Sequence, residues 1–274
     1  MIRLFQIEWL KLRSYRSFKL ITALYFLVVV LVCGSGMFVL EYIKNHAMTG
    51  DFKGVDPTML PIYDFRDIWQ NLTQVASWLK IILAFIIIIS ITNEITFKTL
   101  RQNIIDGLNR KEFVLSKIIM IFGFSLANTL LVFVLGLILG FIYSPVTGMA
   151  DILSGIEFIG GFFITTFTYL LFAFFIALLI KRTGIAIVFF GIYAAFIDPI
   201  TSVIFANAPL PAGFKMVAPY FPVDAINSII PNPFSKYIFQ EFQNHMAITT
   251  MGIVLTEMAV FLSLIFLLLK RKDL

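Results

Sequence analysis

The sequence has little of what a soluble protein or a cofactor-dependent enzyme needs. Only 14% of its 274 residues are charged and 59% are hydrophobic, whereas a soluble domain carries about 25% charged residues. A single cysteine, Cys33, excludes a disulfide framework. No H-E-x-x-H or G-x-S-x-G motif occurs, and the two histidines stand alone. We therefore expect no catalytic, metal or cofactor site on this chain, and no nucleic-acid binding, because a soluble basic face is missing.

Long apolar runs dominate the chain instead. A helix needs about 20 mostly apolar residues to cross a membrane. Six segments qualify, at about 18–40, 78–93, 113–143, 156–180, 184–206 and 248–269. They predict an all-α, polytopic membrane protein with six transmembrane helices in a single transmembrane domain, 1–274. The second segment is short, and we expect Lys80 near its start to reach the outer interface.

The positive charges predict the orientation. Fifteen of the 21 Lys and Arg residues fall in 1–19, 94–117, 181–182 and 270–272. If the chain crosses the membrane six times, these four segments lie on the same side of it. Because Lys and Arg accumulate on the cytoplasmic side of membrane proteins, both termini are predicted to be cytoplasmic. We expect a multi-pass protein of the plasma membrane of a bacterial cell, in contact with the lipid bilayer.

Two segments outside the spans carry distinct patterns. Residues 1–17 place Ile2, Phe5, Trp9 and Leu12 on one stripe among basic residues, which predicts an interfacial elbow helix; a mere orientation signal is the alternative. Residues 207–247 hold six prolines and apolar pieces too short to cross. They fit an outer re-entrant hairpin before the last span, and an ordinary surface loop fits equally well.

The loop 94–112, between the second and third spans, has an amphipathic pattern. Leu100, Ile104 and Ile105 recur at helical spacing. Asn109 with Glu112 three residues later is a capping box that predicts the start of the next helix. The short helix between them suits either docking on a soluble partner or lying on the bilayer, and its spacing does not separate the two.

Several short motifs resemble those of one transporter family. They are Glu94-x-x-x-Lys98-Thr99-Leu100-Arg101, then Asn109-Arg110-Lys111-Glu112 with the later Lys117, and the opening Glu8-Trp9-Leu10-Lys11-Leu12-Arg13. Together they resemble the cytoplasmic loop and N-terminus of type-2 ABC exporter permeases. The chain departs from that pattern at Lys98, where glycine is usual, and at Gly107-Leu108-Asn109, which replaces a Pro-x-Ser turn.

The resemblance implies a permease subunit of an ATP-driven exporter. Its ATPase, with ATP and Mg, is then a separate cytoplasmic polypeptide, and the chain indeed contains no G-x-x-x-x-G-K-[ST] phosphate loop. The further partner is a second permease, identical or paralogous, and the substrate is an amphiphile such as a peptide, an antibiotic or a lipid-like molecule. The resemblance assigns ATPase coupling to Glu94, Lys98, Leu100, Arg101, Ile104 and Ile105.

Two carboxylates within the spans support a different function. Glu257 falls near the middle of the last span and Asp198 toward the outer end of the fifth. Ionisable residues inside a membrane often act in transport, so an ion-coupled secondary transporter or channel is the alternative to the exporter. The chain shows no internal repeat of the kind common in such transporters. For Asp198 a hydrogen-bonded carboxyl at a helix interface is the favoured interpretation, and for Glu257 both stay open.

Overall fold

The computed structural model describes residues 16–46, 58, 60–97, 99, 109–209, 211–233 and 245–271, and all regular structure in them is helical. The principal helices are α2 (Arg16–Gly34), α3 (Gly36–His46), α4 (Ile68–Thr96), α6 (Arg110–Tyr143), α7 (Met149–Leu153), α8 (Glu157–Ile180), α9 (Thr183–Ile192), α10 (Asp198–Asn207), α11 (Ala212–Val217), α12 (Pro222–Asn227) and α14 (Ile248–Arg271). A π-helix, η2 (Tyr193–Ile197), joins α9 to α10, and a 3-10 turn, η3 (Ala218–Tyr220), precedes α12.

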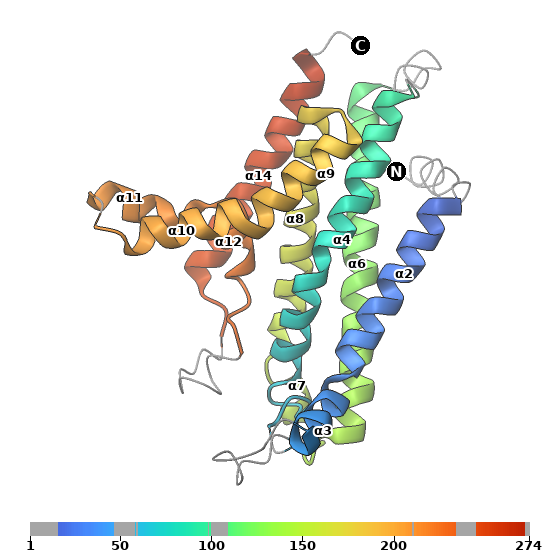
Figure 1. Ribbon diagram of the computed structural model, residues 1–274, viewed down its shortest axis with the longest axis vertical. Coiled ribbons are helices and arrows are strands. Elements are labelled where there is room, and N and C mark those ends of the chain that lie inside the picture. Colours follow the sequence, from blue (N-terminus) through green and yellow to red (C-terminus); the bar gives the residue numbers. More distant parts are fainter. Residues whose placement is uncertain are drawn as a thin grey trace.

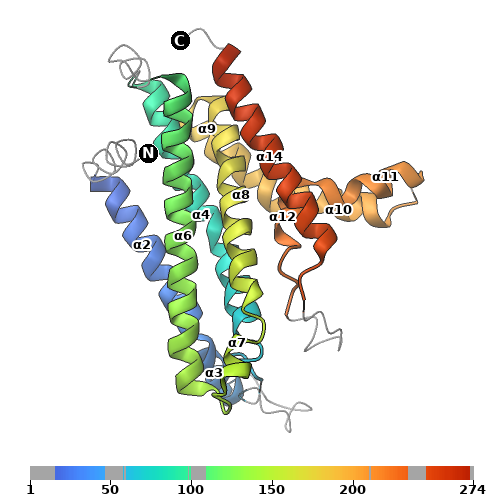
Figure 2. The same cartoon turned by 180° about the vertical axis from the view of Figure 1, so that it is seen from behind.

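The long helices form one bundle with α4 and α8 at its centre (Figures 1 and 2). Nearly half of the buried side chains belong to these two helices, and α2, α6, α9 and α14 pack around them. At one end of the bundle α4 and α14 end and α6 begins; this basic end carries Lys111, Lys117 and Lys270. The opposite, acidic end carries Asp64, Asp67, Asp151 and Glu157.

The number of helices that fit a membrane agrees with the predicted architecture. Five are long and apolar enough to cross: Ile68–Thr96, Lys111–Tyr143, Met149–Ile180, Thr183–Asn207 and Ile248–Lys270. A sixth results if the bent pair Phe18–Gly34 and Gly36–His46 is one span. The protein is thus an all-helical, multi-pass membrane protein with five to six candidate spans.

The first span, which we predicted at 18–40, consists of two helices, α2 and α3, with a bend between them. It bends by 50° between Gly34 and Gly36, where two glycines lower the helix propensity. The hydroxyl of Tyr63 donates to the Cys33 carbonyl at 2.5 Å and accepts from the Gly36 amide at 2.9 Å. A Cβ atom on Gly36 would lie 2.5 Å from that oxygen, so the bend requires glycine there. Burial raises the pKa of the Tyr63 hydroxyl, which therefore stays protonated and able to donate.

The second span is longer than predicted, and its polar residues point inward. We expected it at 78–93, but α4 begins ten residues earlier, at Ile68. Gln70 and Asn71 are buried because the Pro231 and Ile62 carbonyls accept their amide protons, each at 2.9 Å. The prediction that Lys80 reaches the outer interface is wrong, since its side chain is 2% exposed and lies inside the bundle.

Helices α4 and α6 approach closely through two glycines of α6. Gly136 and Gly140 lie against Trp69 and Phe65, and a Cβ on Gly136 would come within 2.6 Å of the Trp69 ring. The sequence Gly-x-x-x-Gly permits such close packing. Here Gly136 accommodates the Trp69 ring of α4, and Gly140 accommodates the ring of Phe65, three residues before α4, at the acidic end of the bundle.

An arm formed by α10 and α11 leaves the bundle sideways, at mid-height in both views (Figures 1 and 2). Many apolar side chains on the arm are exposed, among them Ile200, Val203 and Met216. After η3 the chain returns, and α12 packs on α8, α10 and α14. The chain from 198 to 227 is therefore a loop of short helices whose two ends meet at the bundle.

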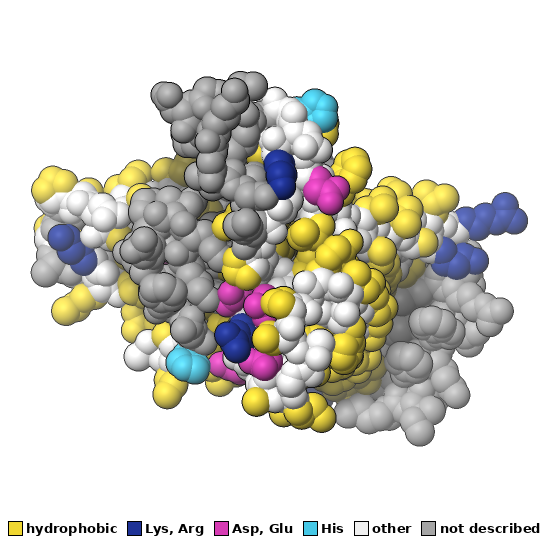
Figure 3. All heavy atoms as spheres, turned by 90° about the horizontal axis from the view of Figure 1, so that it is seen from below, with side chains coloured by type: hydrophobic (Ala, Val, Ile, Leu, Met, Phe, Trp, Pro, Cys, Tyr) yellow, Lys and Arg dark blue, Asp and Glu magenta, His cyan; other side chains and the backbone are white. Residues whose placement is uncertain are grey.

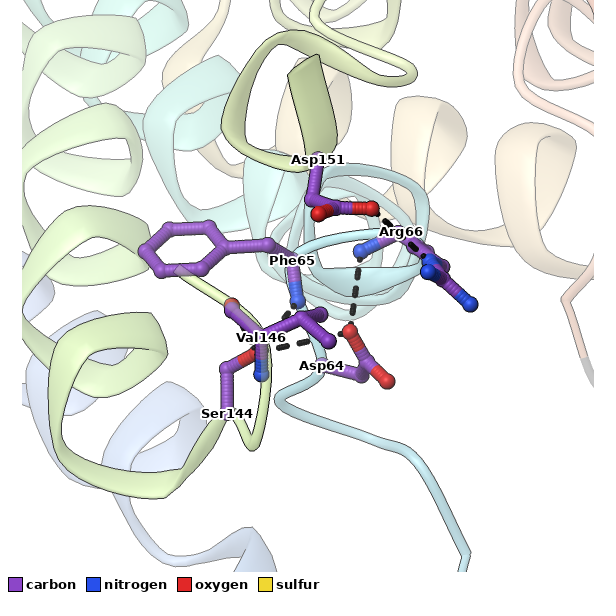
Figure 4. A network of polar contacts seen from close by, with 6 residues as sticks. All are labelled: Asp64, Phe65, Arg66, Ser144, Val146 and Asp151. Carbon is purple, nitrogen blue, oxygen red and sulfur yellow. Dashed lines mark hydrogen bonds and ion pairs between the residues drawn. The ribbon is translucent and has the colours of Figure 1, made fainter. Parts of the chain in front are cut away.

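Polar contacts close the acidic end of the bundle (Figure 4). The Ser144 hydroxyl, directly after α6, accepts from the Phe65 amide at 3.2 Å and donates to the Val146 carbonyl at 2.7 Å. Arg66 pairs with Asp151 of α7 at 2.9 Å, and this hydrogen bond raises the pKa of the Arg66 guanidinium. From below, acidic side chains gather around a basic one (Figure 3).

Candidate functional site

An ion pair joins the two helices that flank the 94–112 loop. Lys117 Nζ of α6 lies 2.6 Å from Glu94 Oε1, near the end of α4, and the Lys117 side chain is fully buried. The Phe113 ring lies beneath the ammonium, at 5.5 Å from its centroid. A buried ion pair is costly to break, because the remaining charge is then left without compensation. The pair therefore sets the distance between α4 and α6 where the loop leaves them.

Two local motifs position the ends of the same loop. The Asn109 side chain and the Glu112 carboxylate form the predicted capping box, and Glu112 Oε2 accepts from the Asn109 amide at 2.8 Å. On the other side the Thr99 hydroxyl donates to the Glu94 carbonyl at 3.2 Å. Both ends of the loop thus leave the bundle from defined positions.

The remaining coupling residues lie outside the described part of the chain. These are Lys98, Leu100, Arg101, Ile104 and Ile105, and the predicted elbow helix 1–17 falls there as well except for its last two residues. Of the residues assigned to coupling, the structure places Glu94 alone. It adds Lys117, which the motif contains but which we had not assigned to the site.

Asp198 lies at the junction of the arm with the bundle. Its side chain is fully buried, and Oδ2 accepts from the Asp224 amide of α12 at 2.8 Å. The Asp224 carboxylate in turn accepts from the Ser202 hydroxyl of α10 at 2.7 Å. Asp198 follows the π-helical turn η2, a feature that is frequent at functional sites. This is the hydrogen-bonded position at a helix interface that the sequence favoured, and Asp224 is a member of it that the sequence did not indicate.

Glu257 lies on α14, near the same junction. It is close enough to Asp198 and Tyr193 to interact with them electrostatically. Both its carboxylate oxygens are buried, and neither has a hydrogen-bond partner among the described residues. An unpaired carboxylate in such a place is costly when ionised.

Comparison with known families identifies the chain. The sequence profile of the ABC-2 family transporter proteins matches residues 4–197, well over half of the molecule. The chain belongs to this family. ABC-2 permeases are membrane subunits without an ATPase domain, and they carry no cofactor. No curated protein matches the sequence.

The matched part includes the ion pair and the whole 94–112 loop. It ends at Ile197, so Asp198, the arm and Glu257 lie beyond it. The match to the family therefore covers the site at the basic end, whereas the two intramembrane carboxylates rest on the sequence and the structure.

Proposed function

We propose that this ABC-2 permease is the membrane subunit of an ATP-driven exporter, with its basic end in the cytoplasm. The Glu94–Lys117 pair carries this proposal, because it fixes the two helices from which the 94–112 loop projects. A loop that receives force from an ATPase needs such a rigid base. The loop then supplies the coupling helix, with Leu100, Ile104 and Ile105 as its apolar contact and Lys98 and Arg101 beside them.

The proposed assembly contains two permeases and two ATPases. The second permease is either an identical copy or a paralogue, and closure of the ATPases on ATP and Mg drives both coupling helices. The exported molecule is an amphiphile, such as a peptide, an antibiotic or a lipid-like compound. A re-entrant hairpin in the segment 207–247 is supported by α11 and α12, which lie at the mid-height of the bundle and not beyond its acidic end (Figure 1).

Family membership favours ATP as the energy source over the ion-coupled alternative. We therefore assign Asp198 and Glu257 to different tasks within the exporter. Asp198 holds α12 against α10, whereas Glu257, whose oxygens lack partners among the described residues, is the intramembrane residue that takes part in transport.

Co-purification from the native membrane tests the proposal. The wild-type chain should retain an ABC ATPase in equal amounts, with two copies of each. Ile104→Asp places a charge in the proposed contact, and loss of a buried interface anchor typically costs over 2 kcal/mol, or at least about thirtyfold in affinity. The variant should reach the membrane normally but lose the ATPase.

Asn103→Asp is the matched control, because it adds the same charge one residue away, outside the apolar pattern. It should retain the ATPase. If Ile104→Asp retains it as well, the loop lies on the membrane and the coupling role is wrong.

A further inference from the structure

A buried lysine connects the helix that leads into the 94–112 loop with the arm. Lys80 lies twelve residues after the start of α4, about 18 Å along a helix that rises 1.5 Å per residue. Its ammonium donates to the Asn227 side chain of α12 at 2.6 Å and lies 5.1 Å from the centre of the Tyr169 ring. A lysine at this depth is costly without partners. If α12 moved away from α4, Lys80 would lose its acceptor Asn227 and remain buried without it.

Neighbouring contacts hold α12 and the residues that follow it on the same side. Gln70 of α4 donates to the Pro231 carbonyl at 2.9 Å, and Thr165 of α8 donates to the Ile226 carbonyl at 3.4 Å. On its other side α12 is bound to α10 through Asp198 and Ser202. The short helix α12 therefore adjoins the arm through α10, packs on α8 and α14, and is linked to α4 by the Lys80–Asn227 hydrogen bond.

The opposite end of α4 carries the coupling site. Glu94 lies fourteen residues beyond Lys80, about 21 Å along the same uninterrupted helix. Near it the Thr92 and Thr183 hydroxyls form a hydrogen bond of 2.8 Å, which ties α4 to the start of α9. A continuous helix with fixed contacts at both ends moves as one body, so a displacement at the loop reaches α12.

We propose that Lys80 is a positioning residue that holds α12 on α4, and that through it the movement of the 94–112 loop reaches the arm. The proposal rests on the proposed ATP-driven function and adds to it the residue that transmits the movement. A change at Lys80 should therefore alter the arm and its response to the loop. The residues proposed to contact the ATPase are themselves unchanged, so the ATPase should still bind.

Amide hydrogen exchange on the purified chain in lipid nanodiscs tests the contact without an ATPase. Lys80→Met keeps the length of the side chain and removes its charge. Residues 222–231 should then exchange at least tenfold faster than in the wild type. Lys215→Met, which removes an exposed lysine on α11, is the control and should leave them unchanged. Asn227→Leu should match Lys80→Met, whereas Asn227→Asp keeps an acceptor and should restore protection.

Spin labels on the complex with its ATPase test the transmission. One label at Met216 on α11 and one at Ile142 on α6, both exposed, should change their distance when ATP and vanadate trap the ATPase. In Lys80→Met that change should be lost while ATP hydrolysis continues. The same outcomes are expected for Asn227→Leu, so the test does not depend on the folding of one variant.

Three results would overturn the inference: unchanged exchange at 222–231 in Lys80→Met, failure of Asn227→Asp to restore protection, or a wild-type distance change in the trapped variant. Failure of the proposed function looks different. In that case the wild-type chain binds no ATPase at all, while the exchange experiment still reports on the Lys80 contact.

Discussion

At the scale of single residues, local patterns were predictable and distant partners were not. The capping box of Asn109 and Glu112 spans four residues, and the sequence alone predicted it correctly. Lys80 was placed at the membrane surface because a lysine in an apolar run normally reaches water. Its acceptor Asn227 lies 147 residues further along the chain. No periodicity within α4 indicates that partner, although a lysine inside an apolar run is itself a signal of function.

Glu257 gives a prediction at this scale. Glu257→Gln keeps the shape of the side chain and removes its ability to ionise. If Glu257 takes part in transport, ATP turnover by the complex should fall about fivefold or more. Fivefold is the lower end of the effects that coupling between two sites typically has. Assembly with the ATPase should stay normal, because Glu257 lies far from the 94–112 loop along α14. A variant with wild-type turnover would restrict Glu257 to a packing role.

At the scale of helices, the apolar runs located the spans but not their ends. The start of α4 was missed because Gln70 and Asn71 read as surface residues, whereas they are buried against carbonyl groups. The break in the first span was also missed, since Gly34 and Gly36 permit a bend but do not require one. The hydroxyl of Tyr63 stabilises it from a separate segment. Long apolar runs thus predict where the spanning helices lie, and tertiary contacts decide where a helix starts and bends.

The packing of α6 against the residues that lead into α4 gives a prediction at this scale. Gly140→Ala brings a methyl group into the Phe65 ring, and such overpacking typically costs about 1–3 kcal/mol. Gly123→Ala in the same helix meets no atom within 4 Å. It should be neutral or stabilise the protein by about 0.5–1 kcal/mol, because alanine favours a helix over glycine. Thermal unfolding in detergent should therefore show a lower midpoint temperature for Gly140→Ala and not for Gly123→Ala. Equal midpoints for Gly140→Ala and the wild type would show that Phe65 moves aside at no cost.

At the scale of the whole molecule, the distribution of charge and the arm make one joint prediction about the membrane. The Lys and Arg residues favour a cytoplasmic basic end. The position of α10 to α12 at mid-height (Figure 2) favours an arm within the lipid and not a loop in water. The same side chains are exposed on the protein whether the arm lies in lipid or in water, so exposure alone does not distinguish the two. A reagent that reacts only in water can distinguish them.

Single cysteines on a Cys33→Ser background test both parts of that prediction in intact cells. Asn45→Cys, exposed at the end of α3 near the acidic end, should react with a membrane-impermeant maleimide. Lys111→Cys, exposed at the basic end, should react only after the membrane is permeabilised. Met216→Cys on α11 is 74% exposed, yet it should react slowly in both conditions, because lipid surrounds the arm. Rapid reaction of Met216→Cys from outside would show that 207–247 is an ordinary surface loop. Reaction of Lys111→Cys in intact cells would show that the orientation is the reverse of the predicted one. The 94–112 loop would then be out of reach of any cytoplasmic ATPase.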